Sequence, residues 1–426
     1  MRDSLLGQAP LDFDIATIAP LDRLEVLFPE ALSVGKQFGI IILPYSGFQI
    51  EVASFRKDGV YLDGRRPSSV TLASAREDAF RRDFTINALF YDWTNNRIID
   101  FVEGRKDLDK RILRTVGDPE ARFSEDKLRL IRALRIAAQV DFEIERRTFC
   151  AIRKLANEIS LVSPERLSSE LRRILGLDHR LRALHDLVNS GLAAALLPEL
   201  NYLAQRSQFW ARKGRLMAKV MGSETRIGLL WALLVWPEAM SRGILKIPSS
   251  RWVEWTKIEF EAFFRRLRFS RDEMSEALFV LSHVSQLVSL KSGDNSKSAE
   301  EKLTREGLKV NKEHSLNREE ARLLLLINER HGISLLDFCR VIEVVWGARE
   351  AGVIDLHHQF VQRIQKDGHL EKPWVTGRDL LELGFQSGPS LGVVLEQLYL
   401  GQIAGLFRNR ADALEEAKRE YVQRDP

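Results

Sequence analysis

Two carboxylates lie two residues apart near the start of the chain, within the otherwise apolar stretch LDFDIA (residues 11–16). Successive side chains of a β-strand point to opposite faces, so Asp12 and Asp14 would share one face while Phe13 and Ile15 pack behind them. Two like charges held this close raise each other's pKa unless a cation lies between them. Hard divalent ions such as Mg²⁺ bind carboxylate oxygens and leave room for phosphate ligands. The pair therefore predicts a metal-dependent phosphoryl- or nucleotidyl-transfer site; the structural alternative is a turn and a strand with two exposed acids.

A third acid is expected on the strands that extend this sheet. Residues 38–43 (FGIIIL) and 48–55 (FQIEVASF) are rich in β-branched and aromatic residues, and the loop 44–47 between them predicts an antiparallel hairpin. Alternation along the second strand places Glu51 on the face opposite Ile50 and Val52. Facing the aspartates, Glu51 would complete a set of three carboxylates, a common number for binding two metals across a phosphate. Otherwise it is an exposed residue on a one-sided sheet.

A polar segment with two adjacent arginines follows this sheet. Residues 56–70 (RKDGVYLDGRRPSSV) predict a long loop because they are rich in Gly, Pro, Asp and Ser. Ser74 and Glu77 have the spacing of a capping box and start a helix that leads into residues 81–89, RRDFTINAL. Arginine suits triphosphate recognition through its forked donors, and Asn and Asp suit sugar hydroxyls. A structural salt-bridge network is the alternative interpretation.

A second polar cluster is expected at the start of a longer helix. Ser124 is the predicted N-cap, with Glu125 and Asp126 in the first helical turn and the helix continuing to Gln139. Three arginines spaced three apart form a basic stripe along it: Arg129, Arg132 and Arg135. The structural alternatives are first-turn acids favoured by the helix dipole and a solvated basic face.

The composition is that of a globular protein with more than one domain. The 426 residues are 45% hydrophobic and 29% charged, and a net charge of +4 favours a polyanionic partner without establishing one. No run of 18 apolar residues and no apolar signal core occur, so we expect a cytoplasmic protein with no membrane partner. Cys150 and Cys339 are far apart and are expected to be buried free thiols, and no His or Cys spacing indicates zinc.

The rest of the chain is predicted to be helical. A helix over 164–175 has Ser163 as N-cap and Pro164 as first residue, and amphipathic stretches separated by short breaks follow residue 178. Residues 291–305 (KSGDNSKSAEEKLTR) resemble a linker. The basic, aromatic run 263–269 (FFRRLRF) indicates either a helix with a solvated face or a contact with RNA.

Together, these strings resemble the class II tRNA nucleotidyltransferases, or CCA-adding enzymes, and the related bacterial poly(A) polymerases. A weaker match lies near the end, in TGRDLLELGFQSGPSLGVVL. The strings that carry the resemblance, in the family's order over about the first 180 residues, are MRDSLLGQAPLDFDIAT, FQIEVASFRKDGVYLDGRRP, RRDFTINAL, DLDKRILRTVGDPEARFSEDKLRLIRALRIA and SPERLSSEL. Five ordered motifs are far more specific than any single one.

The resemblance implies a role for each motif. Asp12 and Asp14 would bind the metal, and together with Glu51 they would be the catalytic acids. Mg²⁺ is the implied cofactor, CTP and ATP are the implied substrates, and the tRNA 3′ end is the implied partner. The motifs further imply a ribose-recognition segment with Arg82 and Asp83, a base-reading motif with Glu125, Asp126 and Arg129, and a later motif in the neck with Glu165 and Arg166. The implied nucleotide-binding residues are Arg2, Asp3, Arg82, Asp83, Asn87, Glu125, Asp126, Arg129, Arg132, Arg135, Glu165 and Arg166.

The implied architecture is an α+β protein with a mixed-sheet, polymerase β-like nucleotidyltransferase head followed by helices. We expect a head over 1–116, a neck with the base-reading motif over 117–178, and a helical body and tail that bind tRNA over 179–426. The expected activity is template-independent addition of C and A to tRNA, and the loop at 56–70 argues against addition of C alone. The alternatives are a poly(A) polymerase, an enzyme that adds only A, and an inactive helical RNA-binding protein.

The start of the chain departs from the family pattern. The family has a strand and a Gly-Gly pair before the segment that begins here at Met1-Arg2-Asp3. We expect a start codon set too far downstream, with in-frame codons for that strand and the glycines lying before it.

Overall fold

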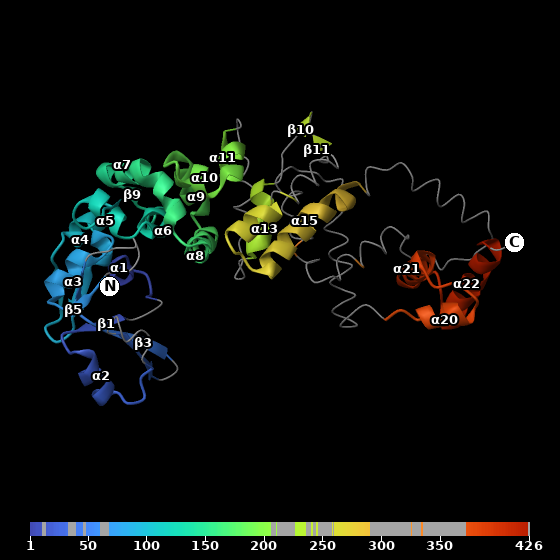
Figure 1. Cartoon of the computed structure of the whole chain (residues 1–426), viewed down its shortest axis with the longest axis horizontal. Helices are drawn as coiled ribbons and strands as arrows, with labels where there is room; N and C mark the ends of the chain where they lie inside the picture. The colour runs from blue at the N-terminus through green and yellow to red at the C-terminus, as the bar shows by residue number, and fades with distance from the viewer. Residues whose placement is uncertain are drawn as a thin grey trace. The chain divides into compact units, whose positions relative to one another are not determined.

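The structure is a computed structural model with two compact units (Figure 1). One comprises Met1–Gly214 with Arg265–Phe269, and the other Arg215–Phe264 with Ser270–Pro426. Among the helices that are described, none is long and apolar enough to cross a membrane. The described residues are 1–10, 14–32, 40–45, 48–59, 68–205, 210, 226–235, 240–241, 244–245, 258, 260–289, 325, 334 and 372–424.

A small mixed sheet organises the N-terminal part of the first unit. Its strands, in spatial order, are β1 (Asp14–Thr17), β3 (Phe48–Ser54) and β2 (Ile40–Tyr45). The predicted hairpin is confirmed, because β2 and β3 pair antiparallel, and β1 adds to β3 in parallel. Helix α2 (Leu21–Leu27) packs on one face, where its Leu24 contacts Ile41 and Val52 in a buried cluster. Glu51 therefore lies on the opposite face, as the alternation predicted.

The predicted loop at 56–70 is in part a β-ribbon, so that prediction was wrong at both ends. Strand β4 (Arg56–Asp58) pairs antiparallel with β5 (Val70–Leu72), while residues 60–67 lie outside the described part. Main-chain pairing outweighs the turn-rich composition at these ends. The predicted capping box of Ser74 is confirmed, and it starts helix α3 (Ala75–Arg81).

The first unit contains further short elements: α1 (Arg2–Leu5), η2 (Thr85–Asn87), β6 (Leu89–Asp92), β7 (Arg97–Asp100), α4 (Gly104–Asp109), β8 (Ile112–Leu113) and β9 (Glu143–Ile144). Strand β6 pairs antiparallel with β7, and β8 pairs in parallel with β9.

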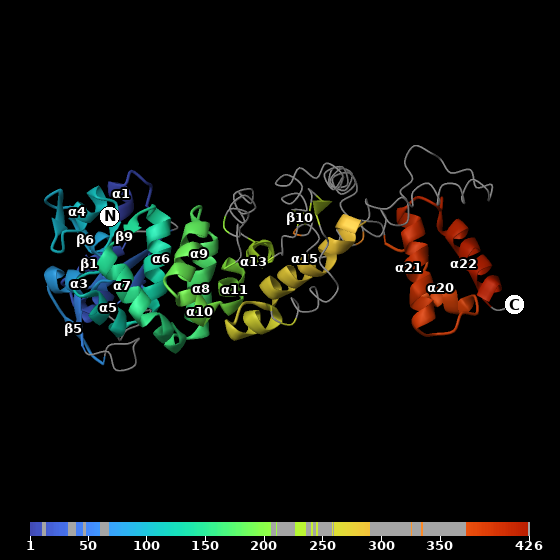
Figure 2. The ribbon, with the colours of Figure 1, turned by 90° about the horizontal axis from the view of Figure 1, so that it is seen from above.

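The helices that follow carry many of the buried apolar side chains of this unit. In Figure 1 and Figure 2 they extend from the strands as a compact group, with α6 packed against α8 and α9. They are α5 (Pro119–Glu125), α6 (Leu128–Val140), α7 (Arg146–Leu155), η3 (Ala156–Leu161), α8 (Pro164–Leu175), α9 (Arg180–Asn189), α10 (Leu192–Leu196) and α11 (Pro198–Ala204). The predicted helix with Pro164 as first residue is confirmed, whereas Cys150 is exposed and not a buried thiol as expected.

The predicted N-cap at Ser124 was wrong. Helix α5 starts earlier, at Asp118-Pro119, where the Asp118 side chain accepts a hydrogen bond from the Ala121 N–H at 2.9 Å. Asp126 then adopts an extended backbone and interrupts the helical path, and its side chain accepts from the N–H of Leu128 at 3.1 Å. Both Asp118-Pro119 and Ser124 are good helix starts by composition, and the earlier one prevails.

The described parts of the second unit are mostly helical. They include one short β-pair, β10 (Met240–Ser241) with β11 (Ile244–Leu245), which the prediction of helical stretches with short breaks missed. The described helices are α13 (Ile227–Val235), α15 (Arg271–Ser289), α20 (Gly377–Glu382), α21 (Pro389–Ile403) and α22 (Arg410–Arg424). The predicted linker at 291–305 and Cys339 lie outside the described residues. The mixed α/β head followed by helices is confirmed as the fold class, and the boundaries at 116/117 and 178/179 stay predictions.

Candidate active site

The acidic part of the site lies on the open face of the small sheet. Asp14 and Glu51 are direct partners in the parallel register of β1 and β3, and both are exposed. Asp12 lies outside the described residues, so its place beside Asp14 stays a prediction.

The donor chemistry of this face fits a hard divalent cation. Asp14 and Glu51 supply carboxylate oxygens from adjacent strands, and oxygen is the ligand that Mg²⁺ prefers. The described part of the chain contains no group of three or more His, Cys, Asp or Glu side chains placed to hold a metal. The predicted trio includes Asp12, so the described residues do not test it.

A chain of polar contacts joins four of the predicted nucleotide-binding residues. The Arg2 guanidinium donates to Asn87 Oδ1 at 2.9 Å, and Asn87 Nδ2 donates to Asp83 Oδ1 at 3.3 Å. Asp83 Oδ2 accepts from Nε and NH2 of Arg132, at 3.1 and 2.6 Å. Arg2 also pairs with its neighbour Asp3 at 2.7 Å. Residues from α1, η2 and α6 are thus brought to one place, although they lie up to 130 positions apart in the sequence.

The central ion pair of this chain sets the charge states of both partners. Burial alone would raise the pKa of Asp83, but the positive charge of Arg132 and its hydrogen bonds outweigh burial and hold that pKa below its usual range. Burial likewise opposes the charged form of Arg132, and the carboxylates of Asp83, Glu170 and Asp126 raise its pKa above its usual value. Both groups are therefore charged at neutral pH.

Arg82 is held at the end of α3 by three different interactions. Its Nε donates to Asp78 Oδ2 at 3.1 Å, and NH1 donates to the carbonyl oxygen of Asn87 at 3.0 Å. The guanidinium also lies over the ring of Phe90, 4.7 Å from its centroid. Arg82 is consequently fixed beside the segment that carries Asp83 and Asn87, as a phosphate- or sugar-binding arginine requires.

Arg135 has a partner that the sequence interpretation missed. Its Nε donates to Glu170 Oε2 at 2.6 Å, and Glu170, from α8, is nearly fully buried. Burial lowers the pKa of Arg135 despite this carboxylate. A signal existed in the sequence, because Glu170 shares the apolar helix face of Leu167, Leu171 and Ile174, where an acid requires a cation. The alternative of a solvated basic face on α6 is wrong for Arg135, which is buried.

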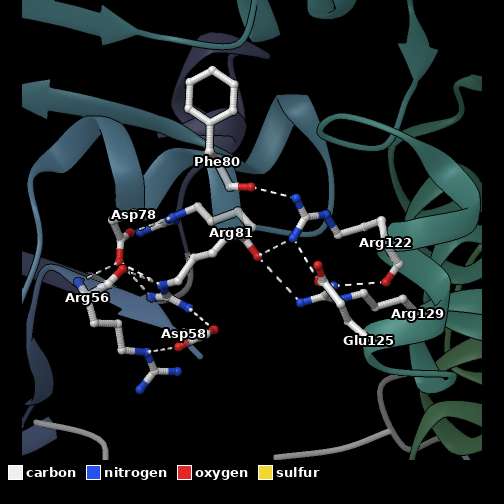
Figure 3. A network of polar contacts seen from close by, with 9 residues as sticks. Arg56, Asp58, Asp78, Phe80, Arg81, Arg122, Glu125 and Arg129 are labelled. Carbon is white, nitrogen blue, oxygen red and sulfur yellow. Dashed lines mark hydrogen bonds and ion pairs between the residues drawn. The ribbon is translucent and has the colours of Figure 1, made fainter. Parts of the chain in front are cut away.

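The predicted base-reading residues are brought together, but Asp126 and Arg129 have different partners. Arg129 NH1 donates to Glu125 Oε2 at 2.5 Å, whereas Asp126 accepts from Arg166 NH2 at 2.7 Å. Figure 3 shows Glu125 between the guanidinium groups of Arg122 and Arg129, all next to the carbonyl oxygen of Arg81. The prediction that Asp126 lies in the first turn of the helix that carries Arg129 was wrong, because Asp126 precedes helix α6.

Glu165 is a predicted nucleotide-binding residue, but its ion pair is formed with Arg268 and not with a residue of the predicted site. It is exposed and forms an ion pair with Arg268, which belongs to the same compact unit. Its pKa lies below the usual range because its own backbone N–H and Arg268 donate to the carboxylate. Its role in nucleotide binding stays a prediction.

A cavity of about 510 Å³ opens beside the base-reading cluster, by which we mean Glu125, Asp126 and Arg129. It extends from strand β4 to helix α5, and its wall includes the side chains of Arg122 and Glu125. Its other lining residues are Lys57, Asp58, Gly59, Glu77, Phe80, Arg81, Ala121 and Ser124.

Family comparison agrees with this geometry. Residues 1–114 match the model of the poly A polymerase head domain, and residues 141–203 match the probable RNA and SrmB-binding site of polymerase A. Both matches lie within the N-terminal half of the chain. The head therefore carries the acidic sheet face and the Arg82–Asp83 segment, which confirms the resemblance noted in the sequence.

Curated relatives of this poly A polymerase-type half are CCA-adding enzymes. That of Bacillus pumilus (strain SAFR-032) is 40% identical over 193 residues, which are 45% of this chain and 48% of the relative. That of Staphylococcus aureus (strain MRSA252) is 42% identical over 176 residues, 41% of this chain and 44% of the relative. The matches thus span about half the length of these relatives.

Solved structures show the same fold. The crystal structure of the Bacillus stearothermophilus CCA-adding enzyme in complex with CTP has a TM-score of 0.70 and 24% identity, covering 100% of this chain and 92% of that one. The Thermotoga maritima CCA-adding enzyme complexed with tRNA has a TM-score of 0.60 and 20% identity, covering 99% and 89%.

Proposed function

We propose that the protein is a template-independent nucleotidyltransferase that adds C and A to the 3′ end of tRNA from CTP and ATP. The observation that carries the proposal is the pairing of Asp14 with Glu51 on the open face of a sheet within the head-domain match. The curated relatives, all about 40% identical over the matched stretch, are named CCA-adding enzymes, which favours this substrate pair.

The reaction joins the 3′-oxygen of the RNA to the α-phosphorus of the nucleotide and breaks the bond to pyrophosphate. Asp12, Asp14 and Glu51 would hold Mg²⁺, which when bound supplies Lewis-acid stabilisation of the phosphate charge. Arg82, fixed by Asp78 and Asn87, is placed to bind phosphate oxygens or sugar. Asn87 and Asp83 offer the amide and carboxylate groups that bind ribose hydroxyls.

We assign the choice of base to two side chains of the base-reading cluster, Asp126 and Arg129. A carboxylate such as Asp126 accepts from the exocyclic amino group of C or A, and a guanidinium such as Arg129 donates to the neighbouring ring acceptor. U and G present the opposite polarity at this position, so neither group would gain a hydrogen bond from the base, at a cost of about 1–3 kcal/mol for each lost partner. Arg166 fixes the carboxylate of Asp126, and Glu125 fixes Arg129, so each group is held by the protein before a base binds.

The second candidate is a poly(A) polymerase, which the family of the matched head domain favours. The length of the product distinguishes a CCA-adding enzyme from a poly(A) polymerase. Purified protein is incubated with Mg²⁺, CTP and ATP, one of them labelled, and either tRNA lacking CCA or tRNA that ends in CC. Addition that stops after CCA supports the proposal, addition of A alone after CC indicates an A-adding enzyme, and long A tails indicate a polymerase. No incorporation by the protein would indicate a helical RNA-binding protein and overturn both enzyme proposals.

A further inference from the structure

One arginine outside the predicted site residues joins three segments around the base-reading cluster. Arg122, in helix α5, donates through Nε to the carbonyl oxygen of Val116 at 3.1 Å and through NH2 to that of Phe80 at 2.6 Å. Its NH1 donates to Glu125 Oε2 at 2.8 Å and to the carbonyl oxygen of Arg81 at 3.4 Å. The side chain is only 14% exposed, and its contacts with Val116, Arg81 and Glu125 are partly buried, whereas the contact with Phe80 lies at the surface.

Two of these acceptors, the carbonyl oxygens of Phe80 and Arg81, lie at the end of helix α3. The last carbonyl groups of a helix have no partner within it, and Arg122 supplies partners for those of Phe80 and Arg81. Arg129 reaches the same place, since its NH2 donates to the Arg81 carbonyl at 3.4 Å and its NH1 to the Arg122 carbonyl at 3.0 Å. Figure 3 shows both guanidinium groups approaching α3 from the same side.

The contacts of Arg122 join two parts of the proposed nucleotide site. The residues that follow α3 directly are Arg82 and Asp83, and the N–H of Val116 donates to the Asp83 carbonyl at 3.1 Å. The residues that follow Arg122 on α5 lead to Glu125, which holds Arg129. Arg122 thus connects the segment assigned to phosphate and sugar with the residue assigned to the base.

We propose that Arg122 is a positioning residue that sets nucleotide selectivity by fixing Arg129 at a defined distance from the Arg82–Asp83 segment. The inference rests on the proposed function. Arg122 need not touch the nucleotide, because it acts through Glu125 and the end of α3. Without Arg122, Arg129 can move relative to the sugar of the bound nucleotide. The enzyme then discriminates less strongly against U and G, because the guanidinium donor is placed less precisely.

Lysine cannot replace this arginine. Arg122 reaches its acceptors with all three nitrogens of its planar guanidinium group. A lysine ammonium has a single nitrogen, which carries three N–H donors. Arg122→Lys keeps the charge beside Glu125 and loses the simultaneous contact with Val116 and Phe80. The lysine variant therefore tests geometry separately from charge.

The experiment measures kcat and KM for CTP, ATP, UTP and GTP on tRNA acceptors, for the unsubstituted chain, Arg122→Lys and Arg122→Ala. We expect the preference for CTP over UTP to fall roughly tenfold or more in both variants, because small displacements of a positioning group cost factors of this size. In an Arg129→Ala background, the same substitutions should leave the preference unchanged, since Arg122 acts through Arg129. Retained preference in Arg122→Lys, or equal effects in both backgrounds, would overturn the inference.

Two controls separate positioning from folding. Added guanidinium should restore the preference in Arg122→Ala, because the deleted side chain lines the 510 Å³ cavity through which the ion can enter. Arg182, in α9, is a matched arginine that donates to the Phe142 carbonyl and to Asp141 and Glu143. Arg182→Ala should lower the melting temperature and keep the preference. A loss of preference in Arg182→Ala equal to that in Arg122→Ala would contradict the positioning role, and no transfer by the unsubstituted chain would overturn the proposed function itself.

Discussion

Two nitrogens of Arg132 donate to the same carboxylate oxygen of Asp83, at 3.1 and 2.6 Å, and so join helix α6 to the segment after α3. Asp83 is mostly buried, and the other carboxylates that act on Arg132 are those of Glu170, at 3.9 Å, and Asp126. Removing the charge of Asp83 leaves a partly buried guanidinium without the partner that binds it directly. We expect Asp83→Asn to lower the free energy of unfolding by about 3 kcal/mol at neutral pH, measured by urea denaturation.

The same substitution should change the acid dependence of stability. The pKa of Asp83 is lowered in the folded protein, so its contribution is complete above the unfolded carboxyl pKa of about 4 and is lost as pH falls through the lower folded value. The difference in stability between the unsubstituted chain and Asp83→Asn should therefore shrink below about pH 4. Asp92→Asn, at an exposed pair with Arg97, is the control and should cost less at every pH. A constant difference from pH 7 to pH 3 would contradict the assigned cause.

Asp14 should be indispensable for transfer and dispensable for tRNA binding. We expect Asp14→Asn to lower kcat more than about a hundredfold, because it removes a charged metal ligand. Binding of tRNA, measured by filter retention, should stay nearly unchanged, because phosphate contacts come mostly from basic side chains. Asp22→Asn, an exposed acid in the first turn of α2, is the matched control and should keep full activity. A near-normal rate in Asp14→Asn would show that the metal assignment is wrong.

Local patterns in the sequence were sufficient to predict the acidic sheet face. The alternation of Ile50, Glu51 and Val52 fixes which side faces α2, and the hairpin between β2 and β3 follows from its length and composition. Side-chain period and turn chemistry act over a few residues, so they are visible without tertiary information.

The partners of the arginines could not be predicted in the same way. Arg135 and Glu170 are brought together by the packing of α6 on α8, 35 residues away, and Arg132 finds Asp83 across 49 residues. The error at Asp126 has a local cause, because two competing helix starts lie six residues apart and only the three-dimensional context decides between them. The sequence thus predicted a salt-bridge network as the alternative interpretation, but it did not predict which residues pair.

Arg129 should govern base choice more than RNA affinity. Its guanidinium is held by Glu125 and by the carbonyl groups of Arg81 and Arg122, with donors left for a base. We expect Arg129→Ala to reduce the preference for CTP over UTP by about ten- to a hundredfold, corresponding to one or two lost hydrogen bonds. The affinity for tRNA should change less than twofold, an order-of-magnitude expectation for a residue that does not contact phosphate. Arg153→Ala, at an exposed position of α7, provides the control, and an unchanged preference in Arg129→Ala would contradict the base-reading role.

Gly104 should be required because main-chain atoms leave no room for a side chain. A Cβ at this first residue of α4 would overlap the carbonyl oxygen of Thr85 and lie 3.0 Å from Leu89 Cδ2. Thr85 starts η2, which also carries Asn87, so relief of the overlap displaces the segment next to Asp83. We expect Gly104→Ala to lower the free energy of unfolding by about 1–3 kcal/mol and to reduce kcat/KM for both nucleotides. Gly392→Ala is the control, because no atom lies within 4 Å of its Cβ in helix α21, and it should be neutral or stabilising by up to about 1 kcal/mol. Equal stability and activity of the two alanine variants would show that η2 tolerates the displacement and does not position Asn87.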